Sequence, residues 1–168
     1  MEKKFFTTQE LVFTALMTAL VFVATYLPHI PIPLGYAHLG DAVIFLLAFL
    51  APRRTTLFAA CIGSALADLL GGFALWIVPT LVIKFVMAEI VCRIGRRGNE
   101  IAPRSGIIAA LFLASLWMAA AYTLAGAVLY ASLPAALAST PGLLMEVAVN
   151  SIITFLLLPV LRERFPSF

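Results

Sequence analysis

LGDAVIFLLAFLAPRRTTLFAACIGSALADLL, residues 39–70, joins two apolar segments through one short turn, Pro52-Arg53-Arg54. The segment before the turn is short for a full membrane crossing, and the segment after it ends at a pair of glycines. Because cationic loops stay on the cytoplasmic side during insertion, the two arginines place this turn in the cytoplasm. The stretch therefore predicts two membrane helices that are joined at the cytoplasmic face.

The same alternation of cations and apolar runs extends along the whole chain. The connections near residues 28–38, 71–79 and 131–141 contain no Lys or Arg. The alternation predicts six crossings with both termini in the cytoplasm. Ten of the 11 cationic residues fall in four places: Lys3 and Lys4; Arg53 and Arg54; Arg93, Arg96, Arg97 and Arg104; Arg162 and Arg164.

The composition agrees with a membrane protein. The chain is 63% hydrophobic and only 11% charged, against roughly 25% charged in soluble proteins. Six helices of about 20 residues use most of the 168 residues, so a single all-α integral membrane domain over 1–168 is expected. We attribute the net charge of +3 to cytoplasmic loops that contact lipid headgroups and not to a nucleic-acid surface. The first apolar segment is expected to be a retained helix, because no small-residue cleavage site follows it.

Proline and glycine positions set the expected helix boundaries. Pro28 ends the first helix, and the Pro-rich segment that follows is an ordered outer loop that holds both histidines, His29 and His38. The helices are expected at about 11–27, 39–51, 55–70, 79–94, 105–131 and 143–161.

Ionisable residues inside apolar segments point to a functional cavity. Asp41, Asp68, Lys84 and Glu146 come from four helices and share the outer third of the membrane in the expected topology. Because charge in lipid is costly and usually faces the bundle interior, we expect these residues to line one cavity that opens outward. Two alternatives stay open: Asp41 and Glu146 cap helix N-termini, or Asp68 and Lys84 form a buried ion pair.

Two further helices supply polar and aromatic side chains. Glu146, Asn150 and Thr154 recur every four residues and therefore form one stripe on the sixth helix. Trp117 and Tyr122 on the fifth helix are candidates for stacking against a flat ring. Trp76 and Tyr130 are expected to be interfacial anchors, and Glu89, deeper on the fourth helix, has no assigned role.

Small residues mark surfaces where helices approach closely. Ala59, Gly63 and Ala67 form a ridge on the third helix, of the kind that lets helix backbones pack closely in lipid. Ala15 and Ala19 form a similar pair on the first helix. That pair either packs inside the bundle or offers a surface to a partner helix.

The sequence contains no pattern typical of an enzyme. Ser64 would need a histidine at membrane depth to act as a nucleophile, but His29 and His38 both fall in the outer loop. Neither a metal-site spacing nor a Gly-rich phosphate loop is present, so we expect no catalysis, metal or cofactor.

Four blocks resemble the substrate-binding S components of energy-coupling factor (ECF) vitamin transporters, which are multi-pass proteins of the prokaryotic cell membrane. The blocks are Ala15-xxx-Ala19, GYAHLGDAVIF at 35–45, GSALADLLGG at 63–72 and PTLVIK at 79–84. The similarity covers nearly the whole chain and includes its length and six-helix topology.

The resemblance implies a high-affinity vitamin binder that lacks its own ATPase. It implies docking through Ala15 and Ala19 onto a transmembrane T subunit that carries two cytoplasmic ATPases. It also implies a binding site near the outer face under the first and third outer loops, with Tyr36 and His38 in the gating loop. The branch it indicates takes up riboflavin-like compounds, pyridoxine, hydroxymethylpyrimidine or pantothenate, and pantothenate would use Lys84 as its counter-ion.

A second function is compatible with the same residues. A self-contained channel or proton-coupled carrier would use Asp68, Lys84 and Glu89 as a relay. Such a carrier transports alone in liposomes, whereas an S component binds its ligand but needs its partner module and ATP for transport.

Overall fold

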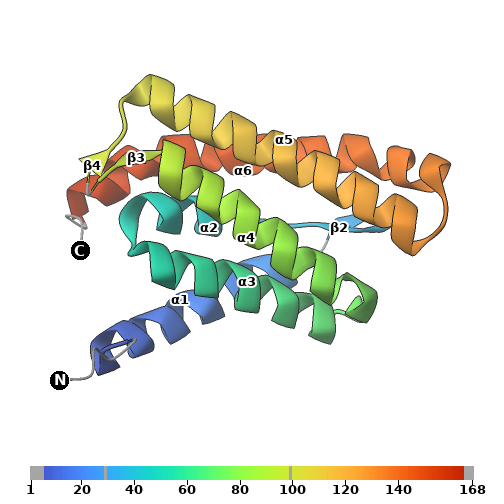
Figure 1. The fold of residues 1–168 in the computed structure, drawn as a ribbon, viewed down its shortest axis with the longest axis horizontal. Coiled ribbons are helices and arrows are strands. Elements are labelled where there is room, and N and C mark those ends of the chain that lie inside the picture. Colours follow the sequence, from blue (N-terminus) through green and yellow to red (C-terminus); the bar gives the residue numbers. More distant parts are fainter. Residues whose placement is uncertain (1–5, 29, 99, 165–168) are drawn as a thin grey trace.

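Six helices dominate the structure, a computed structural model that describes residues 6–28, 30–98 and 100–164 (Figure 1). Lys3, Lys4, His29 and Asn99 lie outside the described residues. The elements in chain order are α1 (Thr8–Tyr26), β1 (Ile30–Ile32), β2 (Gly35–Ala37), α2 (Gly40–Leu50), α3 (Arg53–Leu70), the 3-10 turn η1 (Ala74–Trp76), α4 (Ile77–Ile94), β3 (Arg96–Arg97), β4 (Glu100–Ile101), α5 (Arg104–Leu129) and α6 (Leu133–Arg164).

The helices run side by side, and their connections gather at two ends (Figure 1). One end, the β3–β4 end, holds the start of α1, the α2–α3 turn, the β3–β4 hairpin and the last turns of α6. The opposite end, the cavity end, holds η1, the α5–α6 connection and the β1–β2 hairpin. All the cations of the described inter-helix connections therefore lie at one end, as the alternation along the sequence requires.

Four helical segments of the described chain are long and apolar enough to cross a membrane, and α2 is a shorter apolar helix. The α3 helix is not among the four, and it carries Arg53, Arg54 and Asp68 within 18 residues. The four segments are Thr8–Tyr26, Ala74–Ile94, Arg104–Leu129 and Leu133–Arg164. The structure is thus mostly helical, and several of its helices have the length and composition of membrane-spanning helices.

The short α2 helix lies in the centre of the bundle. It packs against α1, α3, α4 and α6, and all of its residues are buried except Val43, Leu46 and Leu50, which are half-buried. A helix surrounded by other helices has no lipid to span, so its 11 residues suffice.

The small-residue ridge on α3 packs against α1, as the sequence predicts. Ala59 and Ala67 are fully buried, and a side chain added at Gly63 would come within 2.8 Å of the Thr18 carbonyl oxygen on α1. Only glycine therefore permits this close approach. Ala15 and Ala19, by contrast, are exposed, so the alternative in which this pair packs inside the bundle is wrong.

The sixth helix begins ten residues earlier than expected, at Leu133 instead of Leu143. The segment read as an outer loop is helical because Pro134 stands in the first turn, where a missing N–H costs nothing. Pro141 lies inside the helix and removes only the bond to the carbonyl of Leu137. Glu146 therefore sits well inside α6, and the alternative in which it caps a helix N-terminus is wrong.

Two small antiparallel hairpins interrupt the all-α pattern. In the first, Ile30 pairs with Ala37 and Ile32 with Gly35. The Leu34 N–H at its tip donates to the Ser139 hydroxyl on α6, at 3.0 Å. The Pro-rich loop between α1 and α2 is therefore ordered, as expected, and a hydrogen bond attaches it to α6.

Candidate functional site

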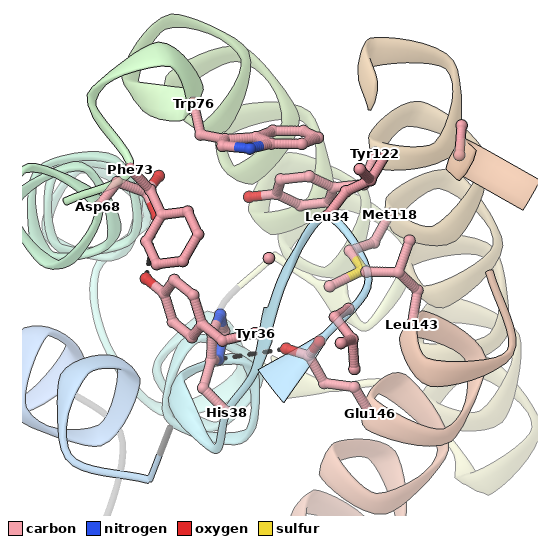
Figure 2. A pocket seen from close by; sticks show the side chains of 13 residues that line it. Leu34, Tyr36, His38, Asp68, Phe73, Trp76, Met118, Tyr122, Leu143 and Glu146 are labelled. Carbon is pink, nitrogen blue, oxygen red and sulfur yellow. Dashed lines mark hydrogen bonds and ion pairs between the residues drawn. The ribbon is translucent and has the colours of Figure 1, made fainter. Parts of the chain in front are cut away.

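A cavity at the cavity end lies beneath the β1–β2 hairpin (Figure 2). Its wall is built from the hairpin, the end of α3, the η1 segment, α5 and α6, so residues far apart in the sequence meet there. The space open to the centres of water molecules is about 50 Å³, which is room for a few waters. The lining residues are Ile32, Leu34, Gly35, Tyr36, His38, Asp68, Phe73, Trp76, Met118, Tyr122, Ala136, Leu143 and Glu146.

Asp68 and Tyr36 form one polar contact of the wall. The Tyr36 hydroxyl donates to Asp68 Oδ1 at 2.9 Å, and both residues are buried. Burial raises the pKa of the Tyr36 phenol, and the neighbouring Asp68 carboxylate raises it further. The phenol therefore keeps its proton and remains a donor to Asp68.

Glu146 and His38 form a second polar contact, with the His38 ring 5.6 Å from the Tyr36 ring (Figure 2). Glu146 Oε1 lies 3.2 Å from His38 Nδ1, and both side chains are buried. The Gly40 N–H donates to the same Nδ1 at 3.1 Å, which requires a lone pair on that nitrogen. Apart from this contact with His38, Glu146 Oε1 has no polar partner among the described residues.

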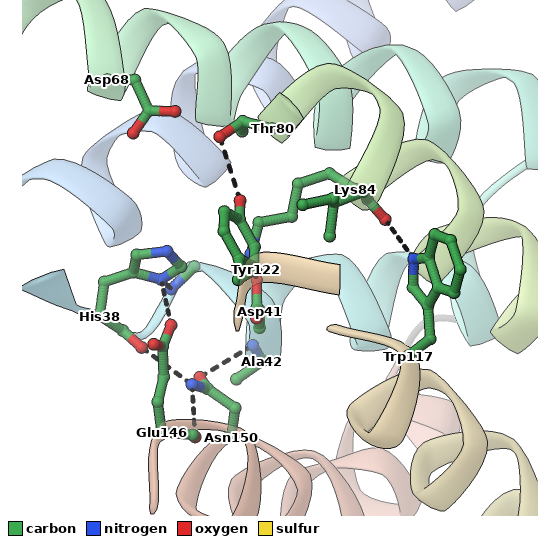
Figure 3. A network of polar contacts seen from close by, with 12 residues as sticks. His38, Asp41, Ala42, Asp68, Thr80, Lys84, Trp117, Tyr122, Glu146 and Asn150 are labelled. Atoms are coloured by element: carbon green, nitrogen blue, oxygen red, sulfur yellow. Dashed lines mark hydrogen bonds and ion pairs between the residues drawn. The ribbon is translucent and has the colours of Figure 1, made fainter. Parts of the chain in front are cut away.

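Lys84 lies beneath the cavity and pairs with Asp41 (Figure 3). Both side chains are completely buried, and the Lys84 ammonium also lies 5.3 Å from the centre of the Tyr122 ring. The alternative in which Lys84 pairs with Asp68 is wrong: Asp68 instead accepts a hydrogen bond from Tyr36. Nor does Asp41 act only as a cap, because its partner is the cation on α4.

Asn150 connects α6 to the start of α2 (Figure 3). Its side-chain oxygen accepts from the Ala42 N–H at 3.0 Å, and its amide nitrogen donates to the His38 carbonyl at 2.8 Å. The α2 helix has no side-chain cap of its own, so α6 supplies the acceptor for its N-terminus. Asn150 thus holds the base of the hairpin and the start of α2 in place.

Aromatic rings form the remaining wall. Trp76 and Tyr122 lie with ring centres 5.6 Å apart, and the Tyr122 hydroxyl donates to Thr80 Oγ1 at 3.1 Å. The Trp76 indole N–H donates to the Tyr130 hydroxyl at 3.3 Å. Trp76 is buried against the cavity, so the prediction that it anchors the chain at the membrane interface is wrong.

The structure brings together only some of the predicted site residues. Tyr36, His38, Asp68, Tyr122 and Glu146 line the cavity, whereas Asp41, Lys84 and Asn150 form a buried layer beneath it. Trp117 is outside both groups, and its indole N–H donates to the Ile83 carbonyl at 3.1 Å (Figure 3).

Phe73, Trp76 and Met118 were not predicted as site residues, although they line the cavity. The available signal was position: Phe73 and Trp76 lie within eight residues after Asp68, in the connection from α3 to α4, and Met118 precedes Tyr122 by one helical turn.

Glu89 belongs to a different cluster at the β3–β4 end. It accepts hydrogen bonds from Arg53 at 2.6 and 2.7 Å and forms an ion pair with Arg93. Neither contact reaches Lys84 or Asp68, so the relay that a proton-coupled carrier would need is not assembled. Among the described residues, no group of three His, Cys, Asp or Glu side chains is placed to hold a metal ion.

Comparison with known proteins gives two findings. A model of the family described as "ECF-type riboflavin transporter, S component" matches residues 5–163. A protein of Pyrococcus woesei described as "Uncharacterized protein in gap 3'region" is 45% identical over 73 residues, which is 42% of this chain and 49% of that protein. The chain thus spans about half the length of this curated relative.

Proposed function

The chain belongs to the family of ECF-type riboflavin transporter S components, and we propose that its cavity binds a small water-soluble vitamin or vitamin precursor. Members of this family are substrate-binding subunits for vitamin uptake. The observation that carries the proposal is the cavity itself, where two acids and several aromatic rings from five parts of the chain converge. A concave, mostly apolar site with a few placed polar groups is typical of small-ligand binding.

The cavity end faces the outside of a prokaryotic plasma membrane in this proposal. The arginines of the described connections lie at the opposite end, which the positive-inside rule assigns to the cytoplasm. With six crossings, both termini are then cytoplasmic, and the ligand reaches the site from outside.

The β1–β2 hairpin serves as the gate. With room for only a few waters, the cavity admits a ring-sized ligand only when the hairpin moves. The Tyr36 hydroxyl holds the hairpin to α3 through its hydrogen bond to Asp68, so a ligand that competes for the Asp68 carboxylate would open the gate.

Uptake requires a transmembrane T subunit and two cytoplasmic ATPases, and α1 carries the surface for docking. Ala15 and Ala19 are exposed and line a shallow groove with Thr14, Thr18 and Phe22 on the same helix. The opposite side of the groove consists of Phe58, Ile62 and Leu66 on α3. Small residues at the bottom of an apolar groove let a partner helix approach closely.

Tryptophan substitution tests the docking surface. Ala15→Trp and Ala19→Trp should leave ligand affinity unchanged and abolish uptake by cells that contain the energising module, because bulk in the groove separates the two surfaces. Ala120→Trp, an exposed alanine on α5 outside the groove, is the matched control and should preserve uptake. Uptake that persists in the α1 variants would refute the docking assignment.

Equilibrium binding tests the proposed function directly. The purified protein should bind one of riboflavin, pyridoxine, hydroxymethylpyrimidine or pantothenate, whereas transport in liposomes should require the partner module and ATP. Transport by the chain alone would instead establish a self-contained carrier. Binding of none of these compounds would refute the proposed function.

A further inference from the structure

A surface groove between α5 and α6 begins at the β3–β4 end, where α5 starts and α6 ends (Figure 1). The charged residues of its mouth are Arg104, Arg162 and Glu163, and the other described lining residues of the mouth are apolar. A second hollow between the same two helices meets the mouth at Phe155, which lines both. We call the mouth and the hollow together the α5–α6 groove. It shares no described lining residue with the cavity beneath the β1–β2 hairpin.

The hollow beyond the mouth is suited to hydrocarbon. Its two polar side chains, Ser115 and Ser151, hydrogen-bond to each other at 3.1 Å, so neither hydroxyl needs a partner from outside the chain. Large apolar side chains on both walls are exposed, among them Phe112, Leu116 and Ile152. Apolar surface that the chain leaves uncovered between two membrane helices contacts hydrocarbon.

The length of this hollow matches one leaflet of a bilayer. It extends from Ile108 to Leu116 on α5 and from Leu144 to Leu156 on α6, which is about 12 and 18 Å at a rise of about 1.5 Å per residue. The hydrocarbon of one leaflet is about 15 Å deep, half of a core of roughly 30 Å. A partner helix that crosses the membrane would need a face along its whole thickness, whereas one lipid chain needs only this length.

The mouth of the groove carries positive charge at the helix ends. Arg104 and Arg162 are exposed, and neither has an ion-pair or hydrogen-bond partner within residues 6–28, 30–98 and 100–164. Arg53 at the same end, by contrast, pairs with Glu89. The two arginines and the single acid, Glu163, leave the mouth a net charge of +1. The planar fork of a guanidinium matches the oxygens of a phosphate, so the mouth is suited to an anionic headgroup.

We propose that the α5–α6 groove binds one anionic phospholipid, with its phosphate between Arg104 and Arg162 and one chain in the apolar hollow. This site is separate from the cavity and goes beyond the proposed function. Basic pockets between membrane helices bind anionic headgroups in this way. The chain gains little by leaving bulk lipid, because lipid tails are as apolar as the groove. The arginines therefore supply the preference for an anionic lipid, and the hollow fixes where that lipid lies.

Native mass spectrometry of the purified full chain tests the site. The protein in detergent would be titrated with phosphatidylglycerol and with phosphatidylcholine that carries identical chains. Phosphatidylglycerol should bind at least about fivefold more tightly, which is the contribution of about one net cation near a lipid surface. Equal affinity for the two lipids would overturn the proposal.

Two charge-matched double variants locate the preference. Arg104→Gln combined with Arg162→Gln should leave the two lipids within about twofold of each other in affinity. Arg97→Gln combined with Arg164→Gln removes the same charge from exposed residues of the same end that do not line the groove, and it should keep the preference. An equal loss in both double variants would reveal a general charge effect and refute the site.

Filling the hollow tests the position of the chain. Ala148→Trp places an indole in the apolar part of the groove and should remove most of the phosphatidylglycerol binding, because the ring takes the space of the lipid chain. Ala120→Trp, at an exposed alanine of α5 that does not line the groove, is the control and should retain the binding. Undiminished binding in Ala148→Trp would contradict the proposed position of the chain.

Other occupants of the groove would give different results. A dimer that dissociates in Ala148→Trp would show that a second copy of the chain fills the groove, and it would exclude the lipid. Inorganic phosphate that raises the melting temperature as much as phosphatidylglycerol does would show that phosphate alone is bound, which also contradicts the proposal. Vitamin affinity in the Arg104 and Arg162 double variant should equal that of the parent, so failure of the lipid site leaves the proposed function standing.

Discussion

The two ends of the bundle use the same kind of ion pair in opposite surroundings. Beneath the cavity, Lys84 and Asp41 are both 0% exposed. At the β3–β4 end, Glu89 pairs with two arginines whose side chains are 52% and 73% exposed, Arg53 and Arg93. The comparison shows that the contribution of an ion pair to stability depends on how deeply the pair is buried.

Desolvation accounts for the contrast. Two ions removed from water lose hydration that their mutual attraction only just replaces, so either ion alone becomes very costly. Ions that remain half in water lose little hydration, and their attraction is weakened by solvent and salt. The buried pair is therefore sensitive to the removal of one partner, and the exposed cluster is tolerant.

The first and largest expected effect concerns which side of the membrane each end occupies. In a variant without Cys61 and Cys92, a cysteine at Ala74 should react completely with an impermeant thiol reagent added to intact cells. A cysteine at Glu100, on the β3–β4 end, should react only after the cells are opened, because cationic connections stay inside. Labelling at Glu100 but not at Ala74 in intact cells would place the β3–β4 end, and not the cavity end, on the outside.

Breaking the buried pair should have the next largest effect. Lys84→Met should lower the free energy of unfolding in detergent by about 3–5 kcal/mol, because it leaves Asp41 buried without a cation. Chemical unfolding followed by tryptophan fluorescence measures the loss. Adding Asp41→Asn should restore most of the stability, whereas adding Asp68→Asn should not. Rescue by Asp68→Asn would show that the pairing on which the comparison depends is wrong.

Removing the amide beneath the cavity should have an intermediate effect. Asn150→Ala leaves the Ala42 N–H and the His38 carbonyl without their partner, at a cost of about 1–3 kcal/mol in the free energy of unfolding. Ser151→Ala, at the next position, removes a half-buried hydroxyl that bonds to Ser115 on α5 and should cost less. Equal losses in the two variants would contradict the idea that this layer organises α2 and the hairpin.

The exposed cluster should give the smallest effect. Glu89→Gln should change the free energy of unfolding by about 1 kcal/mol or less, and the change should shrink as salt is added. Asp41→Asn is the matched change at the buried pair and should cost several times more. A loss at Glu89 as large as that at Asp41 would remove the distinction between the two ends.

Much of the fold could be predicted from local features of the sequence. The helix ends at Leu70 and Ile94 agree with expectation, and those at Leu50, Arg104 and Leu129 fall within about two residues of it. Glycine, proline and apolar runs act over a few residues, so one sequence suffices to read them. The predicted start of α6 was wrong, because the sequence alone does not distinguish a proline in the first turn of a helix from a proline in a loop.

The candidate site was likewise predictable only in part from the sequence. The sequence by itself determined which residues would be expensive in lipid, and hence that Asp41, Asp68, Lys84 and Glu146 would face the interior near one another, because burial of charge is costly wherever it occurs. Only the tertiary structure decided that Lys84 meets Asp41. Which side chains touch depends on how each helix is rotated and where it crosses its neighbours, and a spacing along one chain does not specify those quantities.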